Sequence, residues 1–392
     1  MRRVFWGRTA RDAVTGMALA CAAWALMRYS EQSVQACREG LSLCGNVIVP
    51  SLFPFFVLSS LVVELGLARC LGRAAEGLMW PLFRVGGAGA SALTLGLIGG
   101  YPVGARTAIG LYESGQCSRD ETLRLLAFCN NSGPAFIFGV VGAGVFASGR
   151  IGLCLYLVHA LASLCVGILF RFYGEKGAPG RGRGAQFRAT RFTAALTNSV
   201  KGAARSILNI CAFVLLFTVI VRLLFVCGFM GLAARTVSAL LSGMGVDLRM
   251  AEQLLTGLLE VSAGVTGLAS LSGAGRLPMA AFLLGWAGLS VHCQVLSFLA
   301  DSGLGAGTYL AGKLLHGALS ALFTALLVRL WPVPTPVSGY LAGQLETLAS
   351  VGFPQVLAVS ALCAASIWLA FLLAGAAGRK KGWKSSRNGS IM

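Results

Sequence analysis

Long apolar runs recur along the chain and are separated by short polar connections. A helix needs about 17–25 mostly apolar residues to cross the hydrocarbon core of a bilayer. Runs close to this length predict about eight full spans, at 12–28, 42–65, 121–146, 150–171, 206–228, 278–299, 307–330 and 353–376. The pattern therefore predicts an all-α polytopic membrane protein.

Two further apolar stretches, 86–113 and 251–275, are interrupted in the middle by glycine and small polar residues. Backbone that leaves helical geometry inside a membrane must be buried in protein or line a wet cavity. We therefore expect each stretch to be a re-entrant helical hairpin. The span at 121–146 is interrupted in a similar way and is expected to be a broken helix.

Composition excludes most other classes of protein. Hydrophobic residues make up 56% of the 392 residues and charged residues 12%, whereas soluble domains carry about 25% charged residues. The chain contains no recognisable catalytic or phosphate-binding motif. Its twelve cysteines form no Cys-x-x-Cys pair, so neither a metal site nor a disulfide framework is expected. We expect a protein that is not an enzyme and that needs no cofactor.

The net charge of +18 is gathered in clusters that predict a topology. Four arginines precede the first run, eight basic residues lie in 171–205, and five lie in 379–392. Cytoplasmic loops are rich in Lys and Arg, so these three segments and both termini are expected in the cytoplasm. The number of membrane crossings places all three basic segments on the cytoplasmic side only if each broken stretch enters the membrane and leaves it on the same side. The two hairpins then open to opposite sides of the membrane. We interpret the basic clusters as signals of membrane orientation that also attract anionic lipid, rather than as a nucleic-acid binding surface.

The first run is the least certain span, because a short apolar run after several arginines also describes a signal peptide. We favour a retained first helix, since no clean cleavage site followed by a soluble domain is present.

The two sides of the basic linker resemble each other. The stretch from Gly96 (GLIGGYPVGARTAIG) faces the stretch from Gly257 (GLLEVSAGVTGLASL). Inverted repeats whose broken helices meet at the midplane are common in secondary transporters. The expected organisation is an N-terminal helix and outer loop (1–41), a first repeat (42–171), a basic linker (172–205), a second, inverted repeat (206–331), a C-terminal helix (332–378) and a basic tail (379–392).

Candidate site residues of the first half lie in the two interrupted segments. The tip of the first hairpin supplies Gly100, Tyr101, Pro102 and Gly104, and the helix that restarts there carries Arg106 and Thr107. Free N–H groups at a helix start suit an anion, and a cation at membrane depth is usually functional. Alternatively, Arg106 snorkels or pairs with Glu113. The next interruption supplies Asn130, Asn131, Ser132 and Gly133, which bind a ligand or only repair a Pro-kinked helix.

In the second half, Glu260 stands alone in an apolar stretch. Such carboxylates often relay protons or bind ions; the alternative is a structural pair with Lys313 or Arg222. Ser290 and Gln294 are four residues apart and share a helix face. His292 is a proton site or a packing residue, and His159 and His316 are interpreted as structural.

Four segments resemble a known family. They are PSLFPFFVLS from Pro50, GYPVGAR from Gly100, FCNNSGP from Phe128 and GLSVHCQV from Gly288, and they look like the YlbJ (SpoVV) sporulation integral membrane proteins, which carry the nucleoside-recognition Gate domain. The resemblance runs from about 40 to 375. It implies a membrane protein of spore-forming bacteria that moves dipicolinic acid across the outer forespore membrane. It also implies a distant relation to concentrative nucleoside transporters, which have paired re-entrant hairpins.

The leading hypothesis is a secondary transporter of a small anion, most simply dipicolinate, embedded in the lipid bilayer. Arg106 and the hairpin N-termini would hold carboxylates, Asn130, Asn131 and Ser132 would complete the pocket, and Glu260 would couple a proton. Sodium as the coupling ion and a homo-oligomer stay open. The alternatives are a nucleoside transporter of the concentrative type and a structural membrane protein of spore assembly that transports nothing.

Overall fold

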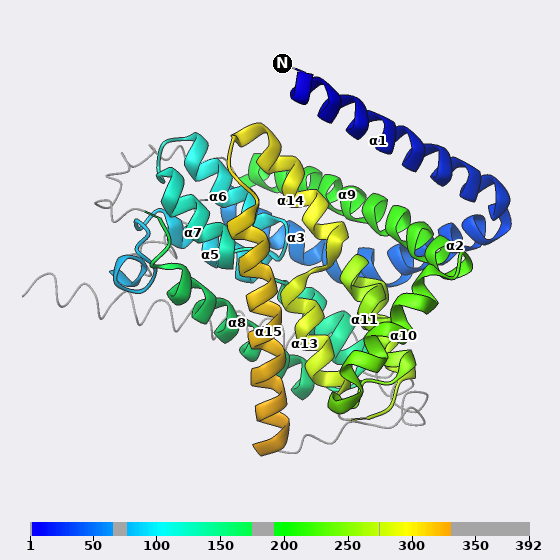
Figure 1. Cartoon of the computed structure of the whole chain (residues 1–392). Coiled ribbons are helices and arrows are strands. Elements are labelled where there is room, and N and C mark those ends of the chain that lie inside the picture. The colour runs from blue at the N-terminus through cyan, green and yellow to red at the C-terminus, as the bar shows by residue number, and fades with distance from the viewer. Residues whose placement is uncertain (1, 66–76, 175–191, 274, 331–392) are drawn as a thin grey trace, which may run out of the picture.

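The computed structural model describes residues 2–65, 77–174, 192–273 and 275–330, and these residues form helices and no strand. The predicted C-terminal span at 353–376, the segments 332–378 and 379–392, and half of the linker 172–205 lie outside the described residues. The first helix, α1 (Arg2–Arg28), stands apart from the body above α9 in Figure 1, and most of its described side chains are exposed.

The helices of the first half are short and often interrupted. They are α2 (Ser30–Leu43), the π-helical η1 (Cys44–Ile48), α3 (Val49–Glu64), α5 (Gly89–Gly99), α6 (Val103–Glu113), α7 (Arg119–Phe128), the π-helical η2 (Ala135–Val145) and α8 (Gly149–Phe170). The predicted broken span 121–146 is thus α7 and η2, joined by non-helical backbone at 129–133.

The second half follows the linker. It comprises α9 (Phe192–Val226), α10 (Phe229–Leu241), η3 (Ser242–Met244), α11 (Leu248–Leu259), α12 (Val261–Gly267), η4 (Leu268–Ser270), α13 (Arg276–Trp286), α14 (Gly288–Ser302) and α15 (Gly307–Leu330). The sequence did not predict α10, which meets α11 at an angle of 114°. In Figure 1, α15 runs down the body beside α13, and the two helices pack together.

Fewer helices qualify as membrane spans than the predicted eight. Within the described residues, four are long and apolar enough: α8, α9, α13 with α14, and α15; two bent pairs, in 30–58 and 229–259, raise the number to six. The predicted span 12–28 belongs to α1, whose uncharged run extends only over 13–27, which is short for a crossing. Helices α7 and η2 are each too short to cross alone.

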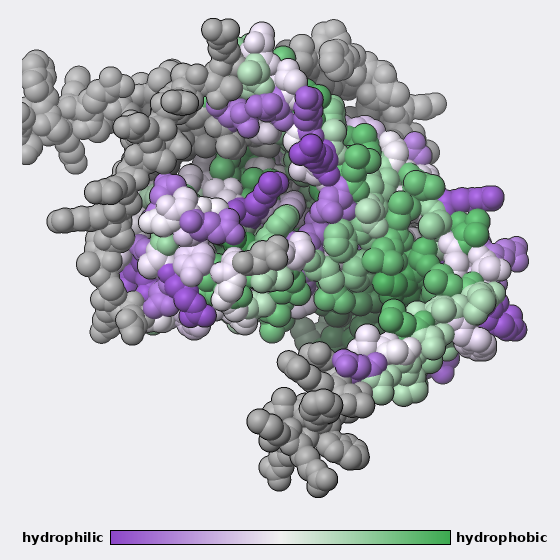
Figure 2. All heavy atoms as spheres, turned by 90° about the horizontal axis from the view of Figure 1, so that it is seen from above, coloured by the Kyte–Doolittle hydropathy of each residue, from purple (hydrophilic) through white to green (hydrophobic). Residues whose placement is uncertain are grey.

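The long helices present apolar side chains outward. Leu153, Leu157 and Leu161 follow one another at intervals of four along α8, and all three are exposed. Exposed leucines spaced by four or eight residues also occur on α15 (Leu314, Leu322 and Leu326) and on α9 (Leu208 and Leu216). Figure 2 shows broad apolar surface, with hydrophilic residues gathered in patches. Water does not favour so much exposed apolar surface, whereas lipid does, so the chain is an integral membrane protein.

Both interrupted apolar stretches fold back on themselves. In a continuous helix, residues eight apart are separated by about 12 Å. A Cβ atom placed on Gly104 would instead lie 2.9 Å from the Cα atom of Gly96, so α5 and α6 lie side by side. In the same way, a Cβ on Gly264 would collide with the Cα atom of Gly257, which brings α11 against α12. The two predicted hairpins are therefore present, and each closes on a glycine pair.

Each hairpin rests on the interruption of a neighbouring broken helix. A Cβ on Gly96 or on Gly104 would collide with the carbonyl oxygen of Cys129, just after α7. In the second half, a Cβ on Gly288, the first residue of α14, would lie 2.9 Å from the backbone nitrogen of Val261 at the tip of the hairpin. This shared construction agrees with a repeat across the linker, while the inverted relation of the halves stays a prediction.

The first hairpin gives a stability test. We expect Gly96→Ala to destabilise the protein by about 3 kcal/mol or to prevent folding, because a backbone carbonyl cannot move aside as a flexible side chain can. The measurement is thermal unfolding of the purified protein in detergent. The matched control is Gly110→Ala on α6, where a Cβ meets nothing within 4 Å. Equal melting temperatures for the two variants would contradict the close contact between the hairpin and Cys129.

Candidate functional site

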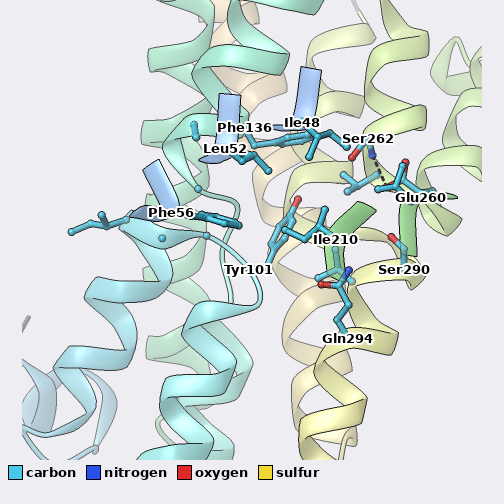
Figure 3. Close-up of a pocket in the computed structure, with 18 residues that line it drawn as sticks. Ile48, Leu52, Phe56, Tyr101, Phe136, Ile210, Glu260, Ser262, Ser290 and Gln294 are labelled. Carbon is cyan, nitrogen blue, oxygen red and sulfur yellow. Dashed lines mark hydrogen bonds between the residues drawn. The ribbon is translucent and has the colours of Figure 1, made fainter. Parts of the chain in front are cut away.

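A cavity lies where the tips of the two hairpins meet (Figure 3). The first hairpin contributes Gly100 and Tyr101, and the second contributes Glu260 and Ser262. The remaining lining residues come from η1 and α3, from the end of α5, from the break after α7, from η2, α9, α12 and α14: Ile48, Leu52, Phe56, Ile98, Gly99, Gly133, Ala135, Phe136, Ile210, Val214, Val261, Ser290, Val291 and Gln294. The cavity therefore joins both halves of the chain.

The lining combines apolar walls with a few polar groups on one side. The rings of Phe56, Tyr101 and Phe136 lie on one side, and Glu260, Ser262, Ser290 and Gln294 lie on the other (Figure 3). Among the described residues that line the cavity, none is Lys, Arg or His. Ligand pockets commonly have this composition, with apolar walls and few oriented polar groups.

Glu260 closes the start of α12. Its carboxylate accepts hydrogen bonds from the backbone N–H groups of Ser262 (3.1 Å) and Ala263 (2.6 Å), and the residue is 1% exposed. An acceptor at this position satisfies N–H groups that have no partner within the helix. The side chain of Ser290 also lies within hydrogen-bonding reach of the carboxylate. Glu260 thus occupies the anion-binding start of α12 itself.

The alternative ion pairs considered for Glu260 are not formed. Arg222 pairs with Glu39, and the ammonium of Lys313 donates to the backbone carbonyl of Asn130. The carboxylate of Glu260 is therefore held by N–H and hydroxyl groups, without a cation from either residue.

The break after α7 has its backbone polar groups paired from several directions. The Phe128 carbonyl accepts from the Asn131 side chain (3.0 Å) and from the Ser163 hydroxyl (2.7 Å). The N–H of Ser132 donates to Nε2 of His159 at 3.0 Å. Asn131 and His159 thus pair backbone groups that the break leaves without helical partners. Three predicted site residues are buried but do not line the cavity: Asn130, Asn131 and Ser132.

His292 is fully buried and does not line the cavity. Its Nδ1 lies 2.9 Å from the hydroxyl of Tyr309, and its ring meets Trp286 edge to face. The Asn130 side chain donates to the same hydroxyl at 3.3 Å. His292 therefore belongs to a buried polar layer that connects α14, α15 and the break after α7.

Four other predicted residues lie on the first hairpin outside the cavity. Pro102 precedes α6, Gly104 meets Cys129, and the Thr107 hydroxyl donates to the Val103 carbonyl within the helix. Arg106 is exposed, and its guanidinium lies 5.9 Å from the ring centre of Phe298.

The structure thus divides the predicted site residues into two groups. Gly100, Tyr101, Gly133, Glu260, Ser290 and Gln294 meet in the cavity, whereas Pro102, Gly104, Arg106, Thr107, Asn130, Asn131, Ser132 and His292 do not line it. Arg106 thus lies outside the cavity in which it was expected to hold carboxylates, and it forms no ion pair with Glu113. Sequence reasoning named Tyr101 but missed Phe56 and Phe136 of the aromatic wall. It also missed the placement of Lys313, although a lysine in an apolar helix was a visible signal.

Comparisons with known proteins concern the sequence family and the fold. The model of the Gate family, described as nucleoside recognition, matches residues 47–174. The sporulation integral membrane protein YlbJ of Bacillus subtilis (strain 168) is 32% identical over 323 residues, which cover 77% of this chain and 79% of the relative.

Solved structures of the concentrative nucleoside transporter CNTnw share the fold. A double variant in an outward-facing state has a TM-score of 0.52 at 14% identity and covers 82% of this chain and 84% of its own. An inward-facing, substrate-bound state also scores 0.52, at 12% identity, with 81% and 84% covered. At these identities the likeness concerns the fold alone.

The capping role of Glu260 can be tested without a substrate. We expect Glu260→Ala to cost about 1–2 kcal/mol of stability, because the N–H groups of Ser262 and Ala263 lose their acceptor. Hydrogen exchange should accelerate in the peptide that covers 257–267. Glu260→Gln keeps one acceptor oxygen and should lose less. Glu252→Ala on α11 is the control, and equal exchange in 257–267 for Glu252→Ala and Glu260→Ala would contradict the capping role.

Proposed function

The chain belongs to the YlbJ family of sporulation integral membrane proteins, and on this premise we propose that it is a secondary transporter of a small ring-shaped carboxylate, with dipicolinate as the first candidate. The meeting of two hairpin tips in one cavity is the observation that carries the proposal. A place in the outer forespore membrane, with both termini cytoplasmic, is part of the same proposal.

The geometry of the hairpins supports transport. In secondary transporters, broken helices meet near the midplane and enclose the substrate, and access alternates around that site. The fold likeness to CNTnw in outward- and inward-facing states supports the same mechanism. The cavity has a free volume of about 40 Å³, room for only a few water molecules at roughly 10–15 Å³ each. A ring-sized solute therefore requires the two hairpins to separate.

The lining supports an aromatic ring with polar substituents. Tyr101, Phe136 and Phe56 offer faces and edges on which a ring can stack. The Ser290 hydroxyl and the Gln294 amide are donors for a carboxylate, and the start of α6 follows directly after the hairpin tip. A helix start favours negative charge. These groups take the place that the sequence hypothesis gave to Arg106.

Glu260 determines how an anion can enter. Two negative charges in one buried site repel strongly, because the local dielectric constant is low. We therefore assign Glu260 the role of the proton carrier: it is protonated when the anion binds, and anion and proton cross together. This assignment follows from the burial of the carboxylate and from its place in the cavity wall.

A nucleoside is the second candidate substrate, and one observation favours it. Among the described lining residues, the polar groups besides Glu260 are hydroxyl, amide and backbone groups, without a cation to balance a dianion. Sugar hydroxyls and base edges suit such a lining. The description of the Gate family and the fold of CNTnw point the same way.

Uptake by proteoliposomes tests the proposal. We expect labelled dipicolinate to accumulate when an inward proton gradient is imposed, and Gln294→Ala to reduce uptake on the order of tenfold, because a charged group loses a hydrogen bond. Thr197→Ala, on the exposed surface of α9, is the control and should transport like the wild type.

Competition by unlabelled nucleosides separates the two substrates. Excess nucleoside should leave dipicolinate uptake unchanged. Nucleoside uptake without dipicolinate uptake would establish the second candidate instead. If well-folded wild-type protein takes up neither solute, the transport proposal is refuted.

A further inference from the structure

Lys313 is buried in the membrane region of α15, beside the break after α7. The residue is 1% exposed, and its Nζ donates to the carbonyl oxygen of Asn130 at 2.8 Å. That carbonyl lies in the non-helical segment 129–133, where it has left the helical hydrogen-bonding pattern. The ammonium thus lies at the end of α7, where it is the hydrogen-bond donor to the Asn130 carbonyl.

One cysteine and three histidines lie close enough to the ammonium to interact with it electrostatically. They are Cys129 just after α7, His159 on α8, His292 on α14 and His316 on its own helix. Within the described residues, no Asp or Glu forms an ion pair with Lys313. A buried charge without an ionic partner is costly, so its surroundings must supply the compensation.

The helix break supplies that compensation. The C-terminal end of α7 carries the negative end of its helix dipole, which favours a cation. Close packing also prevents Lys313 from reaching the surface. A Cβ on Gly312 would collide with the Ala127 carbonyl, and a Cβ on Gly317 would lie 3.0 Å from the Phe282 carbonyl. Helix α15 therefore packs closely against α7 just before Lys313 and against α13 one turn after it.

In transporters with broken helices, unwound carbonyls and helix C-terminal ends are the usual places where a coupling cation is held. Here a covalently attached ammonium occupies such a place. We propose that Lys313 is a built-in cation that fills the cation position of the first broken helix, so that the protein binds no sodium ion there. This proposal implies that transport is independent of sodium, and that implication rests on the proposed function.

Thermal unfolding of the purified full chain tests the built-in cation without any substrate. The melting temperature is measured in sodium, methylammonium and choline chloride at equal ionic strength. Lys313→Ala vacates the position and should admit a small cation. Lys313→Met is the matched control, because its side chain fills the same space without a charge.

We expect the wild type and Lys313→Met to melt at the same temperature in all three salts. Lys313→Ala should melt about 2–4 °C higher in sodium or methylammonium than in choline, because a bound cation stabilises the folded state. A sodium-specific rise in the wild type would overturn the inference, and so would a Lys313→Ala variant with no cation-specific response. If Lys313→Ala does not fold, a sodium-specific rise in the wild type still overturns the inference. Failure here is distinct from failure of dipicolinate uptake, since no substrate is present.

Discussion

The architecture depends on one constraint: a backbone that leaves helical geometry inside a membrane must find partners for its polar groups within the protein. The segment 129–133 meets this constraint with groups from two helices and from the segment itself. Ser163 and His159 come from α8, Lys313 comes from α15, and Asn131 reaches back within the segment. These bonds fix where the break lies, and the break in turn supports the first hairpin through the Cys129 carbonyl. The cavity is thus positioned by hydrogen bonds that lie behind it.

Much of this arrangement could be predicted from the sequence, because glycine and proline interruptions of apolar runs are local signals. They located both hairpins and the break after α7. Two features lacked such a signal: whether the run at 12–28 crosses the bilayer, and the presence of α10 with its sharp bend to α11. The apolar run at 12–28 is close to the shortest length that crosses a bilayer, so its length alone does not decide whether it does. An amphipathic helix such as α10 carries too many polar residues for its sequence to be recognised as a span.

The candidate site was harder to predict than the fold. Arg106 and Lys313 give the same signal in the sequence, a lone cation in an apolar segment. Which of them faces inward depends on how each helix is rotated, and the packing of α6 and α15 decides that. Gly312 brings α15 close to α7, so Lys313 is buried, while Arg106 remains exposed beside Phe298. The wall formed by Phe56, Tyr101 and Phe136 joins α3, a hairpin tip and η2, a meeting that no local pattern reveals.

The contacts also indicate which parts would move if the protein transports. The first hairpin meets the break after α7 at Gly96, Gly104 and Gly133, and the second hairpin meets the α13–α14 break at Gly288. Backbone contacts this close cannot slide without clashes, so each hairpin should move together with its broken helix. The small cavity lies between these two units. The cavity therefore opens only if the two units separate. Glu260 belongs to the unit of the second hairpin, and Asn130, which accepts from Lys313, belongs to the unit of the first hairpin.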